Sequence, residues 1–158
     1  MRQWQLKVDV LTKFKGILFI FIAATGFLAW RLLAPVEIID VHRLDTRDSF
    51  DIIVKNFPLT DKGKIEWWEK NKDVLKVKYN VPVGQDDYGI GFWVGEYKEE
   101  PDTDQGSDLL CFEDMRSTKN CIKKGNQPLQ IWYRKKQRET IFLFDNWQRT
   151  WVIKDSIN

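Results

Sequence analysis

The sequence predicts an α+β protein, with one N-terminal transmembrane helix followed by a small antiparallel sheet and one main packed helix. Three observations predict this fold class. The chain opens with a long apolar run, it contains one extended stretch of helical periodicity, and short β-rich segments occupy most of the rest. The chain has 158 residues. About 120 of them follow the apolar run, which is enough for one small domain with its own core.

The apolar run extends from Ile17 to Ala34 and reads ILFIFIAATGFLAWRLLA. At roughly 18 residues it lies at the short end of the ~17–25 that a helix needs to cross a bilayer. Arg31 lies near its end, where a long side chain can extend to the headgroups. The alternatives are a cleaved signal peptide and a buried soluble helix. Small residues of a cleavage site fall inside the run and not at its end, which favours an uncleaved anchor.

Basic residues before the run predict its orientation. Four of them precede it, namely Arg2, Lys7, Lys13 and Lys15. The positive-inside rule keeps such an N-terminus in the cytoplasm. We therefore expect residues 1–16 to be a cytoplasmic stub, residues 17–34 a transmembrane anchor and residues 35–158 a periplasmic domain. The protein would then be a single-pass protein of a bacterial inner membrane.

Two β-rich segments open the outer domain. Val36–His42 and Phe50–Phe57 are rich in β-branched and aromatic residues, and the polar segment LDTRDS separates them. This pattern predicts a hairpin.

A helix is predicted from about Asp61 to Tyr79. Thr60 is a good N-cap residue, and Asn80 and Pro82 stop the helix. Four residues at helical spacing predict its buried face, namely Ile65, Trp68, Leu75 and Tyr79. Trp67 points off this face, so it either widens the buried face or is exposed for a partner.

Strand patterns return after the helix. Residues 88–97 are β-rich, but their glycines indicate a bulge or a close backbone approach. A short strand is expected within residues 108–115. Residues 128–155 predict a three-stranded meander with turns near Lys136–Glu139 and Asp145–Asn146.

The two cysteines, Cys111 and Cys121, both lie in the predicted outer domain. An oxidising compartment favours a disulfide between them. The alternative is half of a metal site. His42 is the one histidine of the chain, so soft ligands are too few for four-coordinate zinc. We expect the disulfide and no metal.

An acidic loop allows one further test for a metal. Asp102, Asp104, Asp108 and Glu113 occupy positions one, three, seven and twelve of a calcium-loop spacing. Position six, which should be glycine, is Ser107. A solvated loop is therefore the preferred interpretation, and calcium binding between Asp102 and Glu113 stays open.

Catalytic signatures are lacking in the sequence. His42 has no cysteine or serine motif around it, and no phosphate-binding glycine motif occurs. The formal net charge of +2 comes from interspersed charges, so no nucleic-acid partner is indicated. We expect neither enzyme activity nor a cofactor.

Tryptophan is abundant, with eight residues in the chain. Aromatic side chains that are not needed for the core are typical hot spots of protein interfaces. The candidate partner-binding residues are Trp67, Trp93, Trp132 and Trp147.

Several segments together resemble a family of enterobacterial inner-membrane proteins of unknown function. They are PVEIIDVH at residues 35–42, the block from Asn56 to Pro82, and DLLCFEDMRSTKNCI at residues 108–122. The resemblance covers most of residues 17–122, and the cysteine pair matches that of the family. It implies a single N-terminal anchor and a small periplasmic domain.

Two functions fit this organisation. By analogy with small anchored proteins, the first is an immunity protein that binds and neutralises an antibacterial effector, such as one delivered by type VI secretion. The second is an accessory or structural component of an envelope complex. Both make the expected partner a protein, with the membrane contacted through Ile17–Ala34.

Overall fold

The computed structural model describes residues 15–27, 29–30, 34–44, 48–81, 86–100 and 108–154. The chain divides into two compact units, Met1–Pro35 and Val36–Asn158. In the first unit, residues 15–27 and 29–30 are helical and exposed. No helix among the described residues has both the length and the apolar character needed to cross a membrane. Part of the predicted anchor and nearly all of the stub lie outside the described residues.

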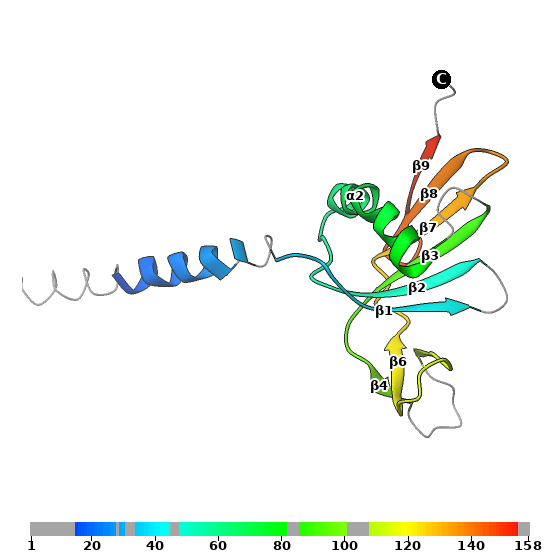
Figure 1. Ribbon diagram of the computed structural model, residues 1–158. Helices are drawn as coiled ribbons and strands as arrows, with labels where there is room; N and C mark the ends of the chain where they lie inside the picture. The colour runs from blue at the N-terminus through cyan, green and yellow to red at the C-terminus, as the bar shows by residue number, and fades with distance from the viewer. Residues whose placement is uncertain are drawn as a thin grey trace, which may run out of the picture. The chain divides into compact units, whose positions relative to one another are not determined.

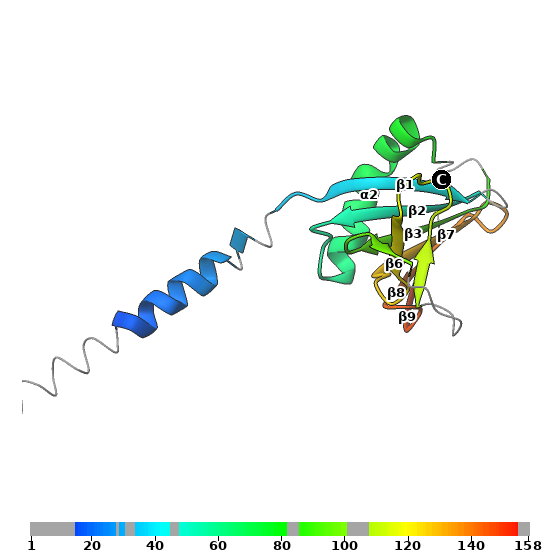
Figure 2. The same ribbon diagram turned by 90° about the horizontal axis from the view of Figure 1, so that it is seen from below.

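The second unit is built on a six-stranded sheet with the order β1-β2-β3-β7-β8-β9. The helix α2 lies across one face of this sheet, and a small three-stranded sheet with the order β4-β6-β5 lies beside it (Figures 1 and 2). The elements of the large sheet and its helix are β1 (Glu37–Leu44), β2 (Ser49–Lys55), α2 (Asp61–Tyr79), β3 (Tyr88–Val94), β7 (Leu129–Arg134), β8 (Glu139–Phe144) and β9 (Arg149–Lys154). Those of the small sheet are β4 (Lys98–Glu99), β5 (Leu109–Cys111) and β6 (Lys119–Lys123). The predicted α+β class is confirmed.

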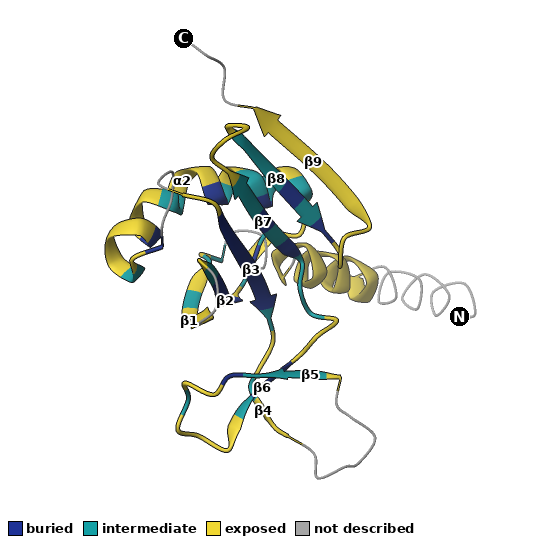
Figure 3. Cartoon of the chain, turned by 90° about the vertical axis from the view of Figure 1, so that its right-hand side faces the viewer, coloured by how far each residue is buried: buried dark blue, intermediate teal, exposed yellow. Residues whose placement is uncertain are grey.

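One strand pair departs from the antiparallel sheet that the sequence predicted. β2 and β3 pair in parallel, with Ser49 opposite Gly89 and Val54 opposite Val94. The prediction was wrong here because α2 is a crossover connection that returns the chain to the starting end of β2. Both strands are buried on their two faces (Figure 3), as is usual for strands next to a crossover.

The predicted bounds of α2 are confirmed. Thr60 Oγ1 accepts a hydrogen bond from the Gly63 backbone N–H at 3.1 Å, which caps the N-terminus. Asn80 adopts a left-handed φ of 56° at the C-cap, a conformation that asparagine tolerates well. The helix is therefore delimited by local sequence signals.

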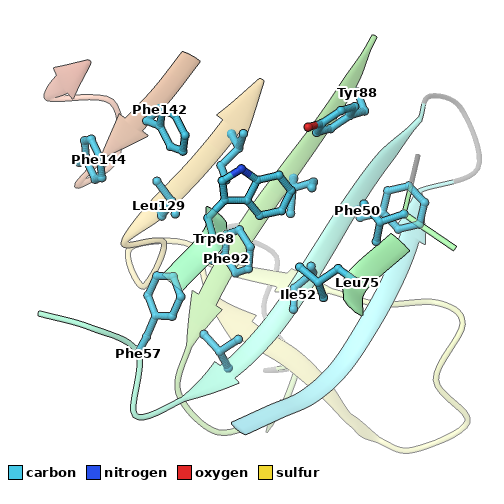
Figure 4. Packing of buried hydrophobic residues seen from close by; sticks show 14 residues of the cluster. Phe50, Ile52, Phe57, Trp68, Leu75, Tyr88, Phe92, Leu129, Phe142 and Phe144 are labelled. Carbon is cyan, nitrogen blue, oxygen red and sulfur yellow. The ribbon is translucent and has the colours of Figure 1, made fainter. Parts of the chain in front are cut away.

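The main core lies between α2 and the large sheet. Trp68 and Leu75 are 1% and 0% exposed, and Ile65 and Tyr79 are partly buried at the edge of the cluster. Figure 4 shows the Trp68 indole in the middle of this cluster. Its ring centroid lies 6.2 Å from that of Phe92. The predicted buried face of the helix is confirmed.

Lys64 is buried as well, which the sequence did not indicate. The residue is 4% exposed, and its Nζ donates to the Pro128 carbonyl oxygen at 3.2 Å. Asp61 lies 3.6 Å from the same nitrogen, and the Phe144 ring lies 5.5 Å from it. A buried ammonium is tolerated because it is paired and hydrogen-bonded. Lys64 therefore joins the first turn of α2 to the sheet.

The small sheet covers the opposite side of β2 and β3. A second apolar cluster forms there from Ile53, Trp93, Phe112 and Ile122. Cys111 and Cys121 are direct cross-strand partners in β5 and β6. The structure joins them in a disulfide, with Cα atoms 3.9 Å apart.

The Cys111–Cys121 disulfide should be present in protein taken from its native compartment. Mass spectrometry should then show a mass two hydrogens below that of the reduced chain. Replacing both cysteines by serine should lower the free energy of unfolding by about 2–3 kcal/mol, the range for a short closed loop. Two freely alkylated thiols in native protein would contradict this pairing.

Candidate functional site

The face of the large sheet opposite α2 carries two cross-strand rows of residues. Partners in register project from the same face of a sheet. The first row is His42, Asp51, Gly91, Gln130, Leu143 and Thr150. The second row is Leu44, Ser49, Gly89, Trp132, Ile141 and Val152. We call this side of the sheet the open face: α2 lies on the other side, and the small sheet covers the open face only over part of β2 and β3.

His42 lies at one end of the first row, in a buried polar cluster. It is 2% exposed, and its Nδ1 lies 2.9 Å from each carboxylate oxygen of Asp114. Because a carboxylate only accepts, Nδ1–H is the donor of this contact. Nε2 lies 2.7 Å from the Tyr97 hydroxyl, and the ring stacks on Phe112 with centroids 3.8 Å apart. His42 thus joins β1 to the segments around the small sheet.

The electrostatics of this cluster keep the Tyr97 hydroxyl protonated. Burial raises the pKa of Tyr97 above its ordinary value, and the negative charges of Asp40 and Asp114 raise it further. Both ring nitrogens of His42 take part in hydrogen bonds, one with Asp114 and one with Tyr97. His42 therefore has a structural environment, in which it holds these two residues in place. The sequence contained no indication of a partner for His42. Its partners in the structure, Asp114 and Tyr97, are 72 and 55 residues away in the sequence.

Asp51 is the second buried titratable group of the row. It is 6% exposed, and Trp93 Nε1–H donates to its Oδ1 at 2.7 Å. Burial raises the pKa of the Asp51 carboxyl, while the Trp93 hydrogen bond and His42 act to lower it.

A hollow of about 290 Å³ opens beside Asp51. Its lining is formed by Leu44, Ser49, Phe50, Asp51, Gly89, Gly91, Gln130 and Trp132. A Cβ atom at Gly91 would lie 2.6 Å from Asp51 Oδ1, and one at Gly89 would lie 3.2 Å from the Trp132 ring. The close backbone approach expected at these glycines is therefore present. We call this feature the open-face hollow.

The outer edge of the sheet is the second candidate surface. All six residues of β9 are exposed (Figure 3), and no other strand of the described chain pairs with its outer side. Four large side chains stand out here, namely Trp147 at 61%, Trp151 at 51%, Val152 at 50% and Ile153 at 42% exposure. We call these four residues the β9 edge surface.

Arg149 fixes the start of this edge. Its guanidinium donates to Asp61 at the beginning of α2 and to Asp145 in the preceding turn. The hydrogen bond from Arg149 holds the pKa of the Asp145 carboxyl below its ordinary value. Trp147 lies in the same turn with φ 76°. Arg149 thus links the exposed strand to the helix through Asp61 and to the preceding turn through Asp145.

The four candidate tryptophans have different environments. Trp67 is half-buried, with ring centroids of Phe57 and Phe92 at 5.5 and 5.7 Å. Of the two alternatives that the sequence left open for Trp67, the structure favours the one in which it widens the buried face of α2. Trp93 was a candidate for partner binding, but it is 7% exposed and its indole N–H donates to Asp51.

The other two tryptophans remain candidates for partner binding. Trp132 is half-buried and forms part of the wall of the open-face hollow. Trp147 is exposed and belongs to the β9 edge surface.

Two groups of residues contain potential metal ligands. Glu100, Cys111 and Cys121 place ligand atoms within 4.8 Å of one another, but the disulfide removes both thiolates. In the acidic loop, Asp102 and Asp104 lie outside the described residues, and Asp108 and Glu113 are exposed. The calcium hypothesis stays a prediction.

Comparisons with known proteins place the chain in a family. No curated protein and no solved structure matches it. A family model described as "Enterobacterial putative membrane protein (DUF943)" matches residues 10–156, nearly the whole chain. The resemblance seen in the sequence is confirmed by this match. The chain therefore belongs to this enterobacterial family.

Proposed function

We propose that this protein is a membrane-anchored protein-binding module whose β9 edge surface receives an extended segment of a partner protein. The observation that carries the proposal is the exposed edge of β9. Four consecutive residues from Thr150 to Ile153 contain no charge and no proline. Natural sheet edges are usually protected by such residues, by bulges or by a covering element. An unprotected apolar edge is a template for strand addition.

The positions of the four side chains fit a partner that covers both sides of this edge. Val152 is in register with Ile141 on the open face, and Trp151 is in register with Phe142 on the helix side. A strand added to β9 would gain backbone hydrogen bonds and cover apolar side chains on both faces. Tryptophan is the residue type most enriched among interface hot spots.

The biological role we propose is immunity, in which the partner is an antibacterial effector that the domain neutralises in the periplasm. The family description as an enterobacterial membrane protein and the apolar run Ile17–Ala34 support an anchored location. A role as an accessory component of an envelope complex is the alternative. Both roles use the same surface and differ in the partner.

The proposed topology can be tested directly. An alkaline phosphatase fused after Asn158 should be active, because this enzyme requires an oxidising compartment. A reporter that works only in the cytoplasm should be inactive at the same position. The intact chain should begin at its original N-terminus. A mature N-terminus downstream of Ala24, or the opposite reporter pattern, would contradict the anchored arrangement.

Val152→Lys should weaken partner binding by placing a charge on the unprotected edge. Deletion of the gene should sensitise cells to sister cells that deliver the effector, and the wild-type protein should restore protection. Val152→Lys should bind the effector at least about tenfold more weakly, or about 1.4 kcal/mol. The matched control is Val77→Lys on α2, where the original side chain is 86% exposed.

Three outcomes separate the possibilities in this experiment. Full protection by Val152→Lys would contradict binding at the β9 edge surface. Equal loss in Val152→Lys and Val77→Lys would point to general damage and also contradict it. A deletion that leaves competition unchanged but removes an envelope complex would replace immunity by the accessory role.

A further inference from the structure

One end of the large sheet contains the beginning of β1 and also the beginning of β9. Glu37 opens β1 opposite Lys55 at the end of β2, and Arg149 opens β9 opposite Phe144 at the end of β8. The strands between them follow the same order, because β3 is parallel to β2 and antiparallel to β7. The chain therefore enters the sheet at the end where the turn before β9 lies. We call this the entry end.

Two large apolar side chains are exposed at the entry end. Leu59, in the loop between β2 and α2, is 65% exposed, and Trp147, in the turn between β8 and β9, is 61% exposed. Arg149 connects these two segments, because its guanidinium contacts both Asp61 at the start of α2 and Asp145 at the start of the turn. The two segments therefore lie side by side. We call Leu59 and Trp147 the entry pair.

The charged groups beside the entry pair compensate one another. Asp61 and Asp145 carry two negative charges, and Lys64 and Arg149 carry two positive charges. Lys64 Nζ lies 3.6 Å from Asp61 and 3.9 Å from Asp145, and Arg149 contacts both acids. An unpaired charge resists transfer out of water, whereas paired charges do so less. The entry pair can therefore approach an apolar phase without carrying an uncompensated charge from this group with it.

The length of the chain before β1 indicates what covers the entry pair. The apolar run ends at Ala34, and Pro35 and Val36 are the two residues between it and Glu37, where β1 begins. Three residue steps span at most about 10 Å. The headgroup region on one side of a bilayer is about 5–7 Å thick. With the run in the membrane, the entry end is therefore held close to the bilayer surface.

We infer that the entry pair inserts into the phospholipid interface of the membrane that carries the anchor. The anchored location rests on the proposed function, whereas the exposure of the two side chains does not. Tryptophan is enriched at membrane–water interfaces, because its ring is apolar and its N–H is polar. Two side chains bind lipid weakly by themselves, but the anchor presents them to the bilayer at a high effective concentration.

This contact fixes the orientation of the domain. β1 and β9 are five strand spacings apart in the sheet order, which is about 24 Å. A domain held at β1 alone can rotate about its short linker, whereas a second attachment near the beginning of β9 prevents this rotation. β9 then runs away from the bilayer, with all of its residues exposed (Figure 3). Trp147 contacts lipid, and Trp151, Val152 and Ile153 stay available to the partner.

The test uses the purified full chain in nanodiscs of phosphatidylethanolamine and phosphatidylglycerol. The photoreactive amino acid p-benzoylphenylalanine replaces one residue in each sample, either Leu59 or Trp147. Irradiation should produce a phospholipid adduct at each of these positions, identified by mass spectrometry. The matched controls carry the same amino acid at Trp151 or Val77, which are 51% and 86% exposed. They should give no adduct above the background without irradiation.

Leu59→Asp tests whether the two side chains act together. The new carboxylate has to lose water to enter the interface, so the yield of lipid adduct at Trp147 should fall at least about tenfold. Val77→Asp introduces the same charge at an exposed position of α2 and should leave this yield unchanged. Circular dichroism checks that both variants are folded. If Leu59→Asp is not folded, Leu59→Ser takes its place, with a loss in the same direction.

Four outcomes would overturn the inference. They are the absence of lipid adducts at both entry positions in a chain that has entered the nanodiscs, equal adducts at all four positions, and an unchanged yield in the folded Leu59 variant. The fourth is an adduct between two protein chains at Trp147, which would make a second copy the occupant.

The results also separate this inference from the proposed function. A full chain that does not enter nanodiscs would contradict the anchored location, and this inference with it. If the lipid adducts are absent while Val152→Lys still loses its partner, binding at β9 stands by itself. If the adducts form as expected while Val152→Lys keeps its partner, the lipid contact stands and the β9 proposal fails.

Discussion

Replacing Trp68 by alanine is expected to lower the free energy of unfolding by about 3–5 kcal/mol, the range for a buried large-to-small change. The side chain is 1% exposed and lies between α2 and the strands of the large sheet (Figure 4). Its removal leaves a cavity that the surrounding rings of Tyr88 and Phe92 cannot fill without leaving their positions. Chemical denaturation followed by circular dichroism measures the effect.

The matched control for this change is Val77→Ala in the same helix. Val77 is 86% exposed, so its truncation removes little buried surface, and alanine is the better helix former. We expect a change within about 0.5 kcal/mol of the wild type. A loss below 1 kcal/mol for Trp68→Ala would mean that this face of α2 does not form the core.

Replacing His42 by alanine is expected to detach the small sheet from β1 and to lower the free energy of unfolding by about 2–4 kcal/mol. The change removes the donor to the Asp114 carboxylate and the contact with the Tyr97 hydroxyl. It also removes the ring that stacks on Phe112. Hydrogen exchange should show faster exchange for the amides of β5 and β6, with smaller changes in β7 and β8.

Tyr97→Phe is the graded control for the His42 cluster. It deletes one hydroxyl and keeps the ring that contacts Phe112 edge-on. We expect a loss of about 1 kcal/mol and nearly unchanged protection of the small sheet. If the amides of β5 and β6 keep wild-type protection in His42→Ala, the cluster does not hold the small sheet in place.

The sequence by itself determined the elements whose signals are local. Thr60 and Asn80 delimit α2 by local contacts. The Thr60 side chain caps the first turn, and the left-handed backbone of Asn80 closes the last turn. The spacing of Trp68 and Leu75 defines the buried face of α2 in the same way. The strands of the C-terminal meander alternate with turns at residues 135–138 and 145–148, close to the predicted positions.

Contacts between residues far apart in the sequence could not be predicted from local sequence patterns. The parallel pairing of β2 with β3 depends on how α2 packs across the sheet, which no local pattern records. The burial of Lys64 had no signal in the sequence, because it depends on compensation of its charge by Asp61 and by the distant Pro128 carbonyl. Helical spacing left open whether Trp67 is buried or exposed, and it is the contact with Phe57 that extends the core to Trp67.

The residues of the candidate site come together only in the tertiary structure and could not be predicted from the sequence. His42 and Asp114 are 72 residues apart in sequence, and Asp51 and Trp93 are 42 residues apart. The glycines at 89 and 91 did signal a close approach, but not which side chains would face it. Asp51 and Gln130 flank Gly91 only because of the register of β2, β3 and β7. That register is decided by packing the whole domain, since a shift of one residue would turn every side chain of a strand to the other face.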